Sequence, residues 1–387
     1  MLDVARRIGA AIDGERDRMI ALLAALVAIG TENPPGREYP ACVDAIERAL
    51  DDLAFEHERI AIASPDAQRA AVAAWVGPPG PTLYFHGHYD VVPAFQPSQF
   101  EPRLEGDTMF GRGTSDMKSG LVSMLFAARA VRDAGSPLGG RIGLLFVPDE
   151  ETGGRHGSAA IAAMGRLGTD AIGMLLPEPT SGVVWNANRG AVTLEATVRG
   201  RAAHVGLAHL GVNAFERAVA IVDDLLALKR DLPPGAVLLV GGRVEAGTNF
   251  NVVPDVCRFT VDRRTTPDED FAAERSRLLA IFDRARAAGI DVAVDVFQEG
   301  SASKTAADGP LARALASSVT QVTGTPPAFE ECPGLLENRF YAERGVPALA
   351  YGPGILAVSH GPQEFVKISR MIEVAKIYAV TALALLG

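Results

Sequence analysis

The strongest constraint on the fold of this chain is its order of strands and helices, which changes part-way along. Up to about residue 182, helical patterns at 41–53 and 121–134 alternate with strand patterns at 82–85 and 141–147. Strands and helices in alternation predict an α/β layer architecture.

Residues of about 187–298 follow a different order. Strands are predicted at 191–198, 237–244, 256–262 and 292–297, and helices at 214–229 and 268–288. This β-α-β-β-α-β order is that of the ferredoxin-like split βαβ motif. We therefore expect a small domain at 187–298, inserted into a larger domain made of 1–184 and 300–387. A helix from 310, a strand at 346–351 and a helix from 368 would complete the larger domain.

Charge and composition exclude several classes of protein. Apolar residues make up 48% of the 387 residues, as in an ordinary folded domain. The formal net charge of −10 argues against a nucleic-acid-binding protein. The apolar run at 19–30 is too short to cross a bilayer, and acidic residues precede it without a clear cleavage site after it. Three widely spaced cysteines fit a reducing compartment, so we expect a cytoplasmic protein without a membrane anchor.

Histidines and carboxylates follow the predicted strands or lie between elements at five places. They are His88 with Asp90, Asp116 in a glycine-rich loop, the pair Glu150 and Glu151, then Glu178, and finally His360. Ligands of open α/β sheets bind at the carboxyl ends of the strands. Taken singly, such residues are commonly structural: a carboxylate before a helix can be only an N-cap, and a glutamate pair can lie on a solvated face.

Charge counting suggests a pair of divalent cations. Asp116, Glu151 and Glu178 carry three negative charges, which two divalent cations and one hydroxide would balance if both histidines are neutral. Nitrogen and oxygen ligands without thiolate suit Zn²⁺, Co²⁺ or Mn²⁺, and the ligand types do not choose among these metals. Glu150 would then be left without a metal and free to act as a general base.

The surrounding segments together resemble the M20 family of metallo-aminoacylases and peptidases, which includes acetylornithine deacetylase, succinyl-diaminopimelate desuccinylase and carboxypeptidase G2. The matching segments are Asn33-Pro34-Pro35-Gly36, residues 87–93, Gly111-Arg112-Gly113 with Asp116-Met117-Lys118, residues 149–154, Glu178-Pro179-Thr180, and Gly352-Pro353-Gly354 with His360 and Glu364. The resemblance implies a phosphorylase/hydrolase-like zinc-peptidase domain that carries an inserted lid and dimerisation domain.

The resemblance also implies a role for each matching residue. Asp116 would bridge two metals, with His88 and Glu178 completing one site and Glu151 and His360 the other. Asp90 would hold His88, and Glu150 would be the catalytic base. In the inserted domain, His204 would reach across a homodimer to steady the oxyanion. Asn251 and Arg264, with Gly354 of the larger domain, would contact a small substrate that bears a carboxylate.

The sequence departs from the family in three places. Many members have a proline shortly after the lid histidine, where this chain has Val205-Gly206-Leu207. Many read Gly-Thr-Asp-Ala-Arg where this chain has the segment 333–340, which lines the substrate pocket in relatives. His86 is also unusual, and packing is favoured over a metal role for it.

We predict hydrolysis of the amide bond of a small N-acyl amino acid or peptide-like substrate by a metal-bound water. Hydrolysis of another C–N bond, in an amidine, ureido group or aryl amine, is the alternative, and a non-catalytic scaffold with a lapsed site is a third. The Ser-x-x-Lys sequences at 115–118 and 301–304 lack the partner motifs of β-lactamases, which argues against a serine hydrolase. Cys332 is expected to be a buried, inert thiol rather than a nucleophile.

Overall fold

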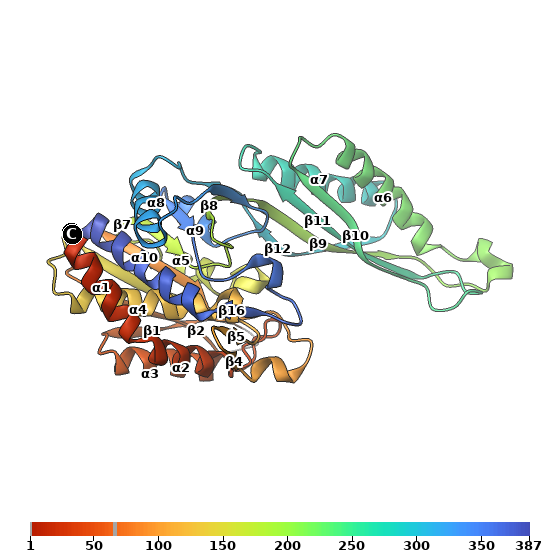
Figure 1. Cartoon of the computed structure of the whole chain (residues 1–387). Coiled ribbons are helices and arrows are strands. Elements are labelled where there is room, and N and C mark those ends of the chain that lie inside the picture. Colours follow the sequence, from red (N-terminus) through yellow and green to blue (C-terminus); the bar gives the residue numbers. More distant parts are fainter. Residues whose placement is uncertain (1, 65–67) are drawn as a thin grey trace. The chain divides into compact units, whose positions relative to one another are not determined.

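The computed structural model describes residues 2–64 and 68–387 and divides the chain into two compact units (Figure 1). The first unit consists of Met1–Ala187, Lys304–Cys332 and Glu337–Gly387. The second consists of Asn188–Ser303 together with Pro333–Leu336, a short segment that the sequence analysis assigned to the larger domain. The fold is α/β, and each unit is described separately below.

A nine-stranded mixed sheet forms the centre of the first unit. Its main path is β1-β2-β6-β3-β7-β15-β8-β13, and β14 pairs with β8. The bounds are β1 His57–Ile62, β2 Arg69–Val76, β3 Thr82–His88, β6 Arg141–Val147, β7 Ala171–Leu176, β8 Val184–Asn188, β13 Ser303–Lys304, β14 Phe329–Cys332 and β15 Ala348–Ala350. Strands β6, β3, β7 and β15 are neighbours and all run parallel. Their carboxyl ends therefore lie at one edge of the sheet.

Strand β3 is buried on both faces, as expected for a central parallel strand. Successive side chains point to opposite faces. On one face, Phe85 packs against Tyr378, with ring centroids 4.8 Å apart. On the other face, Tyr84 and His86 meet the ring of Tyr341 at 5.8 Å and 5.5 Å. His88 continues this second row at the end of the strand.

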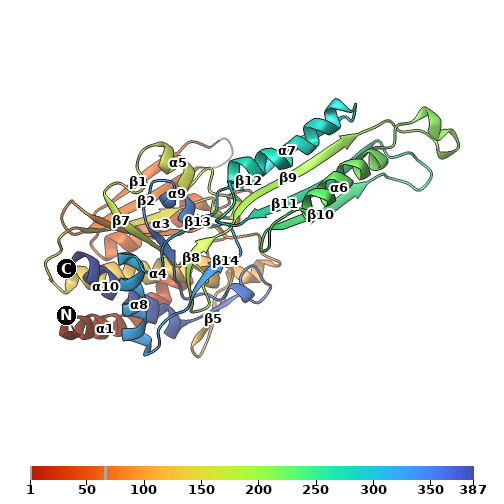
Figure 2. The same cartoon turned by 90° about the horizontal axis from the view of Figure 1, so that it is seen from above.

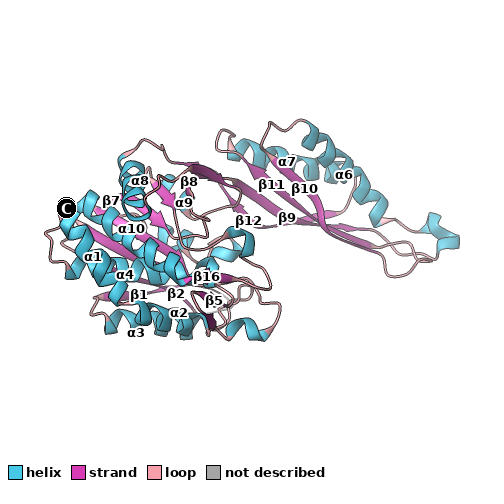
Figure 3. Ribbon diagram, viewed as in Figure 1, coloured by secondary structure: helices cyan, strands magenta, loops and turns pink. Residues whose placement is uncertain are grey.

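Helices cover the sheet, as the colouring by secondary structure makes clear (Figure 3). They are α1 Leu2–Gly14, α2 Arg16–Val27, α3 Tyr39–Asp52, α4 Ser119–Asp133, α5 Ser158–Ala163, α8 Pro310–Thr323, α9 Asn338–Ala342 and α10 Ile368–Leu386. One continuous apolar core joins α1–α4, α8 and α10 to the sheet. Beside it, a small sheet has the order β16-β5-β4, with bounds Phe365–Lys367, Thr108–Phe110 and Arg103–Glu105. Among the residues described, none of the helices combines the length and apolar character needed to span a bilayer.

The second unit has the element order β9-α6-β10-β11-α7-β12. The bounds are β9 Gly190–Arg199, α6 Ala214–Arg230, β10 Val237–Ala246, β11 Val256–Thr265, α7 Phe271–Ala287 and β12 Val292–Gly300. The four strands form an antiparallel sheet in the order β10-β11-β9-β12. Helices α6 and α7 lie beside each other along this sheet in both views (Figures 1 and 2). Alternate residues of β9 and β11 face the helices and form a separate apolar core.

Candidate metal centre and active site

Three neighbouring parallel strands deliver side chains to one place. His88 ends β3, Glu150 and Glu151 lie in the short helical turn Glu150–Thr152 after β6, and Glu178 follows β7. Because β6, β3 and β7 are adjacent and parallel, their carboxyl ends meet. His88 Nε2 lies 3.7 Å from Glu178 Oε1 and 3.9 Å from Glu150 Oε2.

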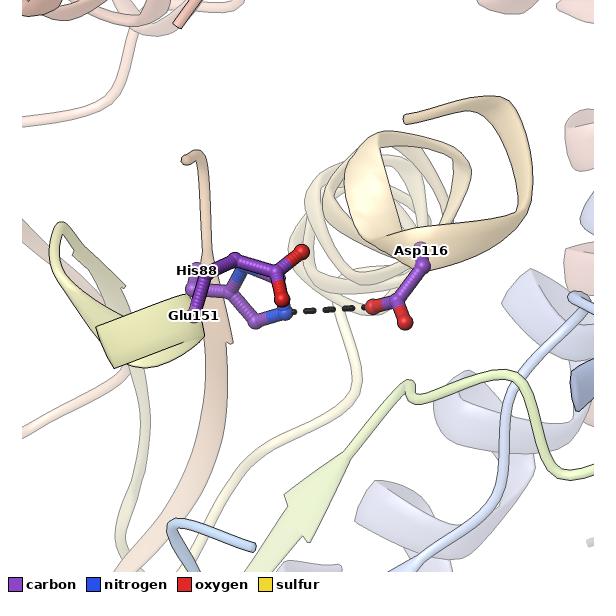
Figure 4. A group of neighbouring side chains, drawn as sticks. All are labelled: His88, Asp116 and Glu151. Atoms are coloured by element: carbon purple, nitrogen blue, oxygen red, sulfur yellow. Dashed lines mark ion pairs between the residues drawn. The ribbon is translucent and has the colours of Figure 1, made fainter. Parts of the chain in front are cut away.

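Asp116 lies between the two histidines and presents one carboxylate oxygen to each. Its Oδ1 is 3.3 Å from His88 Nε2, and its Oδ2 is 3.3 Å from His360 Nε2. Glu151 Oε2 is also 3.3 Å from His360 Nε2. Figure 4 shows the Asp116 carboxylate pointing toward the His88 ring, with Glu151 beside that ring. Ligand atoms of His88, Asp116 and Glu151 all lie within 4.8 Å of one another, which is close enough to hold a metal ion.

The loop that carries Asp116 is held by Glu364, a residue that sequence reasoning did not select as a site residue. Glu364 Oε1 accepts hydrogen bonds from the backbone N–H groups of Gly113, Ser115 and Asp116, at 2.9–3.0 Å. Its other oxygen accepts from the buried Arg112, at 2.5 Å. The motif Gly352-Pro353-Gly354 with Glu364 contained this residue, but nothing in its spacing indicated that it caps another loop.

Gly354 packs directly against the same loop. A Cβ atom at this position would lie 2.3 Å from the carbonyl oxygen of Ser115, so no larger residue fits without moving the backbone. In this structure Gly354 therefore supports the Asp116 loop. Its predicted contact with substrate stays a prediction.

Asp90 is completely buried and connects His88 to the glutamate pair. His88 Nδ1 lies 3.0 Å from the Asp90 carbonyl oxygen and 3.5 Å from its carboxylate. The Asp90 carboxylate also accepts from the backbone N–H groups of Glu150 and Glu151 and from Asn33 Nδ2. With Nδ1 donating, the lone pair of His88 Nε2 points at the carboxylate cluster, as a metal ligand requires.

The cluster contains several buried carboxylates close together, and bound cations would stabilise their charged forms. Burial raises the pKa of Glu150, Glu151 and Glu178, and neighbouring carboxylates raise it further. Burial opposes protonation of His88, yet the adjacent carboxylates of Asp116 and Asp90 hold its pKa well above the ordinary value. His88 Nε2 and Glu178 Oε1 are buried and have no hydrogen-bond partner within residues 2–64 and 68–387. Such orphaned atoms fit metal ligands, and the donor set suits a divalent cation.

His360 differs from the other candidate ligands because its side chain is 52% exposed. Hydrogen bonds to Asp116 and Glu151 raise its pKa to about 11. It sits in a left-handed backbone conformation, with φ of 62°, just after the short helical turn Leu356–Val358. The cluster is thus reached by solvent on the His360 side.

His86 is engaged by protein groups at both ring nitrogens. Nε2 lies 2.7 Å from Glu337 Oε2 and 3.0 Å from Ser158 Oγ, and Nδ1 lies 3.1 Å from the Tyr341 hydroxyl. The ring and the Glu337 side chain are fully buried. This arrangement favours packing over a metal role for His86.

The remaining predicted site residues belong to the second unit. His204 is exposed, and its Nδ1 accepts from the Gly206 N–H at 3.1 Å. The Asn251 carbonyl accepts from Val205 N–H at 2.9 Å. Arg264 is bound by both oxygens of Asp262, at 2.7 Å and 2.9 Å, so its fork is already occupied by a carboxylate within the unit.

Comparison with known proteins assigns the chain to a family. The sequence profile of peptidase family M20/M25/M40 matches residues 84–384. The chain belongs to this family. An M20 relative from Alkalilimnicola ehrlichii, a succinyl-diaminopimelate desuccinylase, is 29% identical over 388 residues, covering 95% of this chain and 99% of its own.

Solved M20 structures share the fold at low sequence identity. The di-peptidase Dug1p of Saccharomyces cerevisiae is 15% identical and covers 98% of each chain, with a TM-score of 0.81. A dinuclear metal-binding M20 peptidase of Bacillus subtilis is 16% identical, covers 97% of this chain and 99% of its own, and has a TM-score of 0.68. These matches establish the α/β fold of the M20 enzymes for this chain.

Proposed function

We propose that this M20 metallohydrolase cleaves the amide bond of a small N-acyl amino acid or short peptide, using two divalent metal ions. The observation that carries the proposal is the position of Asp116, with one carboxylate oxygen facing each of two histidines. The desuccinylase relative and the dinuclear M20 peptidase of Bacillus subtilis support the reaction class and the metal count.

The ligands divide into two sets that share Asp116. His88 and Glu178 would complete one metal site, and Glu151 and His360 the other. Nitrogen and oxygen donors without thiolate suit Zn²⁺, Co²⁺ or Mn²⁺, and we propose Zn²⁺ first. Divalent cations bound there would polarise the scissile carbonyl and lower the pKa of a water toward about 7.

Glu150 is assigned the role of general base. It is the one carboxylate of the pair that does not contact His360, and it lies 3.9 Å from His88 Nε2. Its carboxylate would take a proton from the attacking water and return it to the nitrogen of the leaving amine. Asp90 keeps Glu150 in place through the Glu150 N–H.

The second unit is proposed to be a ferredoxin-like lid and homodimerisation domain. Because His204 Nδ1 accepts from Gly206, its Nε2 carries the proton and could donate to an oxyanion in the partner subunit. Asn251 and Arg264 would bind a substrate carboxylate. For Arg264 this requires either its remaining donors or displacement of Asp262. The three cysteines are buried thiols, which supports a cytoplasmic location.

A panel of acylated amino acids tests the reaction. Chelated protein restored with Zn²⁺, Co²⁺ or Mn²⁺ should release primary amine from one class among N-acetyl, N-succinyl, N-carbamoyl and N-formyl amino acids and dipeptides. Turnover should vanish again on chelation. Turnover of N-carbamoyl substrates alone would favour the alternative reaction at a ureido bond. If the metal-loaded protein released no amine from any substrate of the panel, the result would contradict the amidohydrolase proposal.

Mixing two inactive variants tests the shared site. His204→Ala and Glu150→Ala proteins should each be inactive, because each lacks a group that acts on the same substrate. Random subunit exchange makes about half of the dimers mixed, each with one intact site, so about a quarter of the wild-type activity should return. Mixing wild-type protein with Glu150→Ala protein should leave every wild-type site active with or without exchange, so this mixture controls for activity lost through the mixing procedure. Lack of recovery after verified exchange would show that His204 does not act across the dimer.

A further inference from the structure

Two features that the sequence analysis singled out, His86 and the segment 333–340, meet in the structure. His86 comes from β3, and Glu337 comes from the unusual segment 333–340, yet they are in contact at 2.7 Å with no exposed surface on either side chain. Ser158 and Tyr341 complete the hydrogen bonds of the imidazole. A buried imidazole–carboxylate pair with all ring donors and acceptors engaged fixes the backbone on both sides of it.

The backbone fixed in this way carries Arg339, two residues after Glu337. Arg339 is 2% exposed, and its guanidinium stacks on the Phe340 ring at 4.1 Å. Its Nη2 donates to the carbonyl oxygen of Gly153 at 2.7 Å. Gly153 closes the short turn that begins with Glu150 and Glu151, so a buried cation is bonded to the segment that presents the base.

The turn has several residues with positive φ, and hydrogen bonds from other segments hold it in this conformation. Asp149, Gly153 and Gly154 all have left-handed φ values, of 76°, 97° and 70°. Asp90 holds the front of the turn by accepting from the N–H groups of Glu150 and Glu151. Arg339 holds its end, and Glu337 packs so closely that a Cβ on Gly154 would lie 3.1 Å from Glu337 Oε1.

The charges agree with this geometry. Burial lowers the pKa of Arg339, while the nearby carboxylates of Glu337 and Glu150 favour its charged form. An arginine remains protonated even so. Glu150 therefore lies 3.9 Å from the candidate ligand His88 and is near enough to Arg339 for their charges to attract each other.

We propose that Arg339 is a positioning residue for Glu150, holding the Glu150–Gly153 turn so that the base stays aligned with the metal ligands. The His86–Glu337 pair anchors the segment that carries Arg339. This inference rests on the proposed role of Glu150, and it gives the segment 333–340 a function other than direct contact with substrate.

Arg339→Met and Arg339→Lys test the proposal, with Arg344→Met as the matched control. Arg344 also donates to backbone carbonyls, those of Phe340 and Ala162, but it is exposed and away from the turn. A displaced base should lower kcat of Arg339→Met by about ten- to a hundredfold. KM should stay within about threefold of wild type, because substrate binding is untouched. Arg339→Lys restores one charged donor and should recover part of kcat.

Hydrogen exchange and metal content provide readouts that need no substrate. Amides of residues 149–157 should exchange faster in Arg339→Met than in wild type or Arg344→Met, while the metal content is unchanged. Unaltered exchange would overturn the proposal even if the protein proves inactive on every amide tested. It would also be overturned if saturating metal restored wild-type kcat to Arg339→Met, since Arg339 would then act through the ligand Glu151.

Discussion

Glu150→Gln should leave the metal ions bound and reduce kcat by at least about a hundredfold, the usual scale for loss of a general base. Glutamine has nearly the same shape as glutamate, so the backbone N–H of residue 150 can still donate to Asp90. It cannot accept the proton of the attacking water. Steady-state kinetics together with metal analysis of the same preparation measure both effects.

Glu101→Gln is a suitable control, since Glu101 is exposed and lies outside the cluster. It should leave kcat and metal content unchanged. Near-normal kcat for Glu150→Gln would exclude Glu150 as the base. A loss of metal with the loss of turnover would instead make Glu150 a ligand.

Asp116→Ala should remove both metal ions, because a single carboxylate faces both histidines. Metal content should fall from about two ions per chain to nearly none, and turnover should disappear with it. Glu178→Ala and Glu151→Ala should each weaken only one of the two sites. Metal analysis after dialysis at limiting free Zn²⁺ separates these outcomes.

Thermal unfolding gives an independent measure of the same site. Zn²⁺ at about a hundred times its dissociation constant should stabilise the wild-type protein by about 2.7 kcal/mol for each site that it fills, and Asp116→Ala should show almost no such gain. Equal stabilisation of both proteins would mean that the metal binds elsewhere. Retention of one full equivalent by Asp116→Ala would contradict a bridging role.

The main arrangement of the candidate site follows from local sequence patterns. His88, Glu150 and Glu178 each come after a run of buried strand residues, and parallel neighbours bring such ends together without further information. In the larger sheet, only β3, β6 and β15 were predicted as strands, so the strand before Glu178, β7, was missed together with β1, β2, β8, β13 and β14. Strand β2, Arg-Ala-Ala-Val-Ala-Ala-Trp-Val, is rich in alanine, whose local preference is for helix, so its place beside β6 is set by tertiary packing.

The supporting contacts could not be read from the sequence. Glu337 contacts His86 across 251 positions of the chain, and Arg339 reaches Gly153 across 186. No periodicity or local motif specifies which buried side chain meets which at such separations. The roles of His204, Asn251 and Arg264 remain predictions from the family resemblance, and the Asp262–Arg264 ion pair was not anticipated.

The hydrogen bonds between Glu364 and the Asp116 loop can form only late in synthesis of the chain. The loop leaves the ribosome about 250 residues before Glu364, whose carboxylate accepts hydrogen bonds from the N–H groups of Gly113, Ser115 and Asp116. His360, which faces Asp116 Oδ2, arrives equally late. A nascent chain can thus build most of its sheet while the cluster is still incomplete, and the proposed metal ligands can come together only after residues 360–364 have emerged.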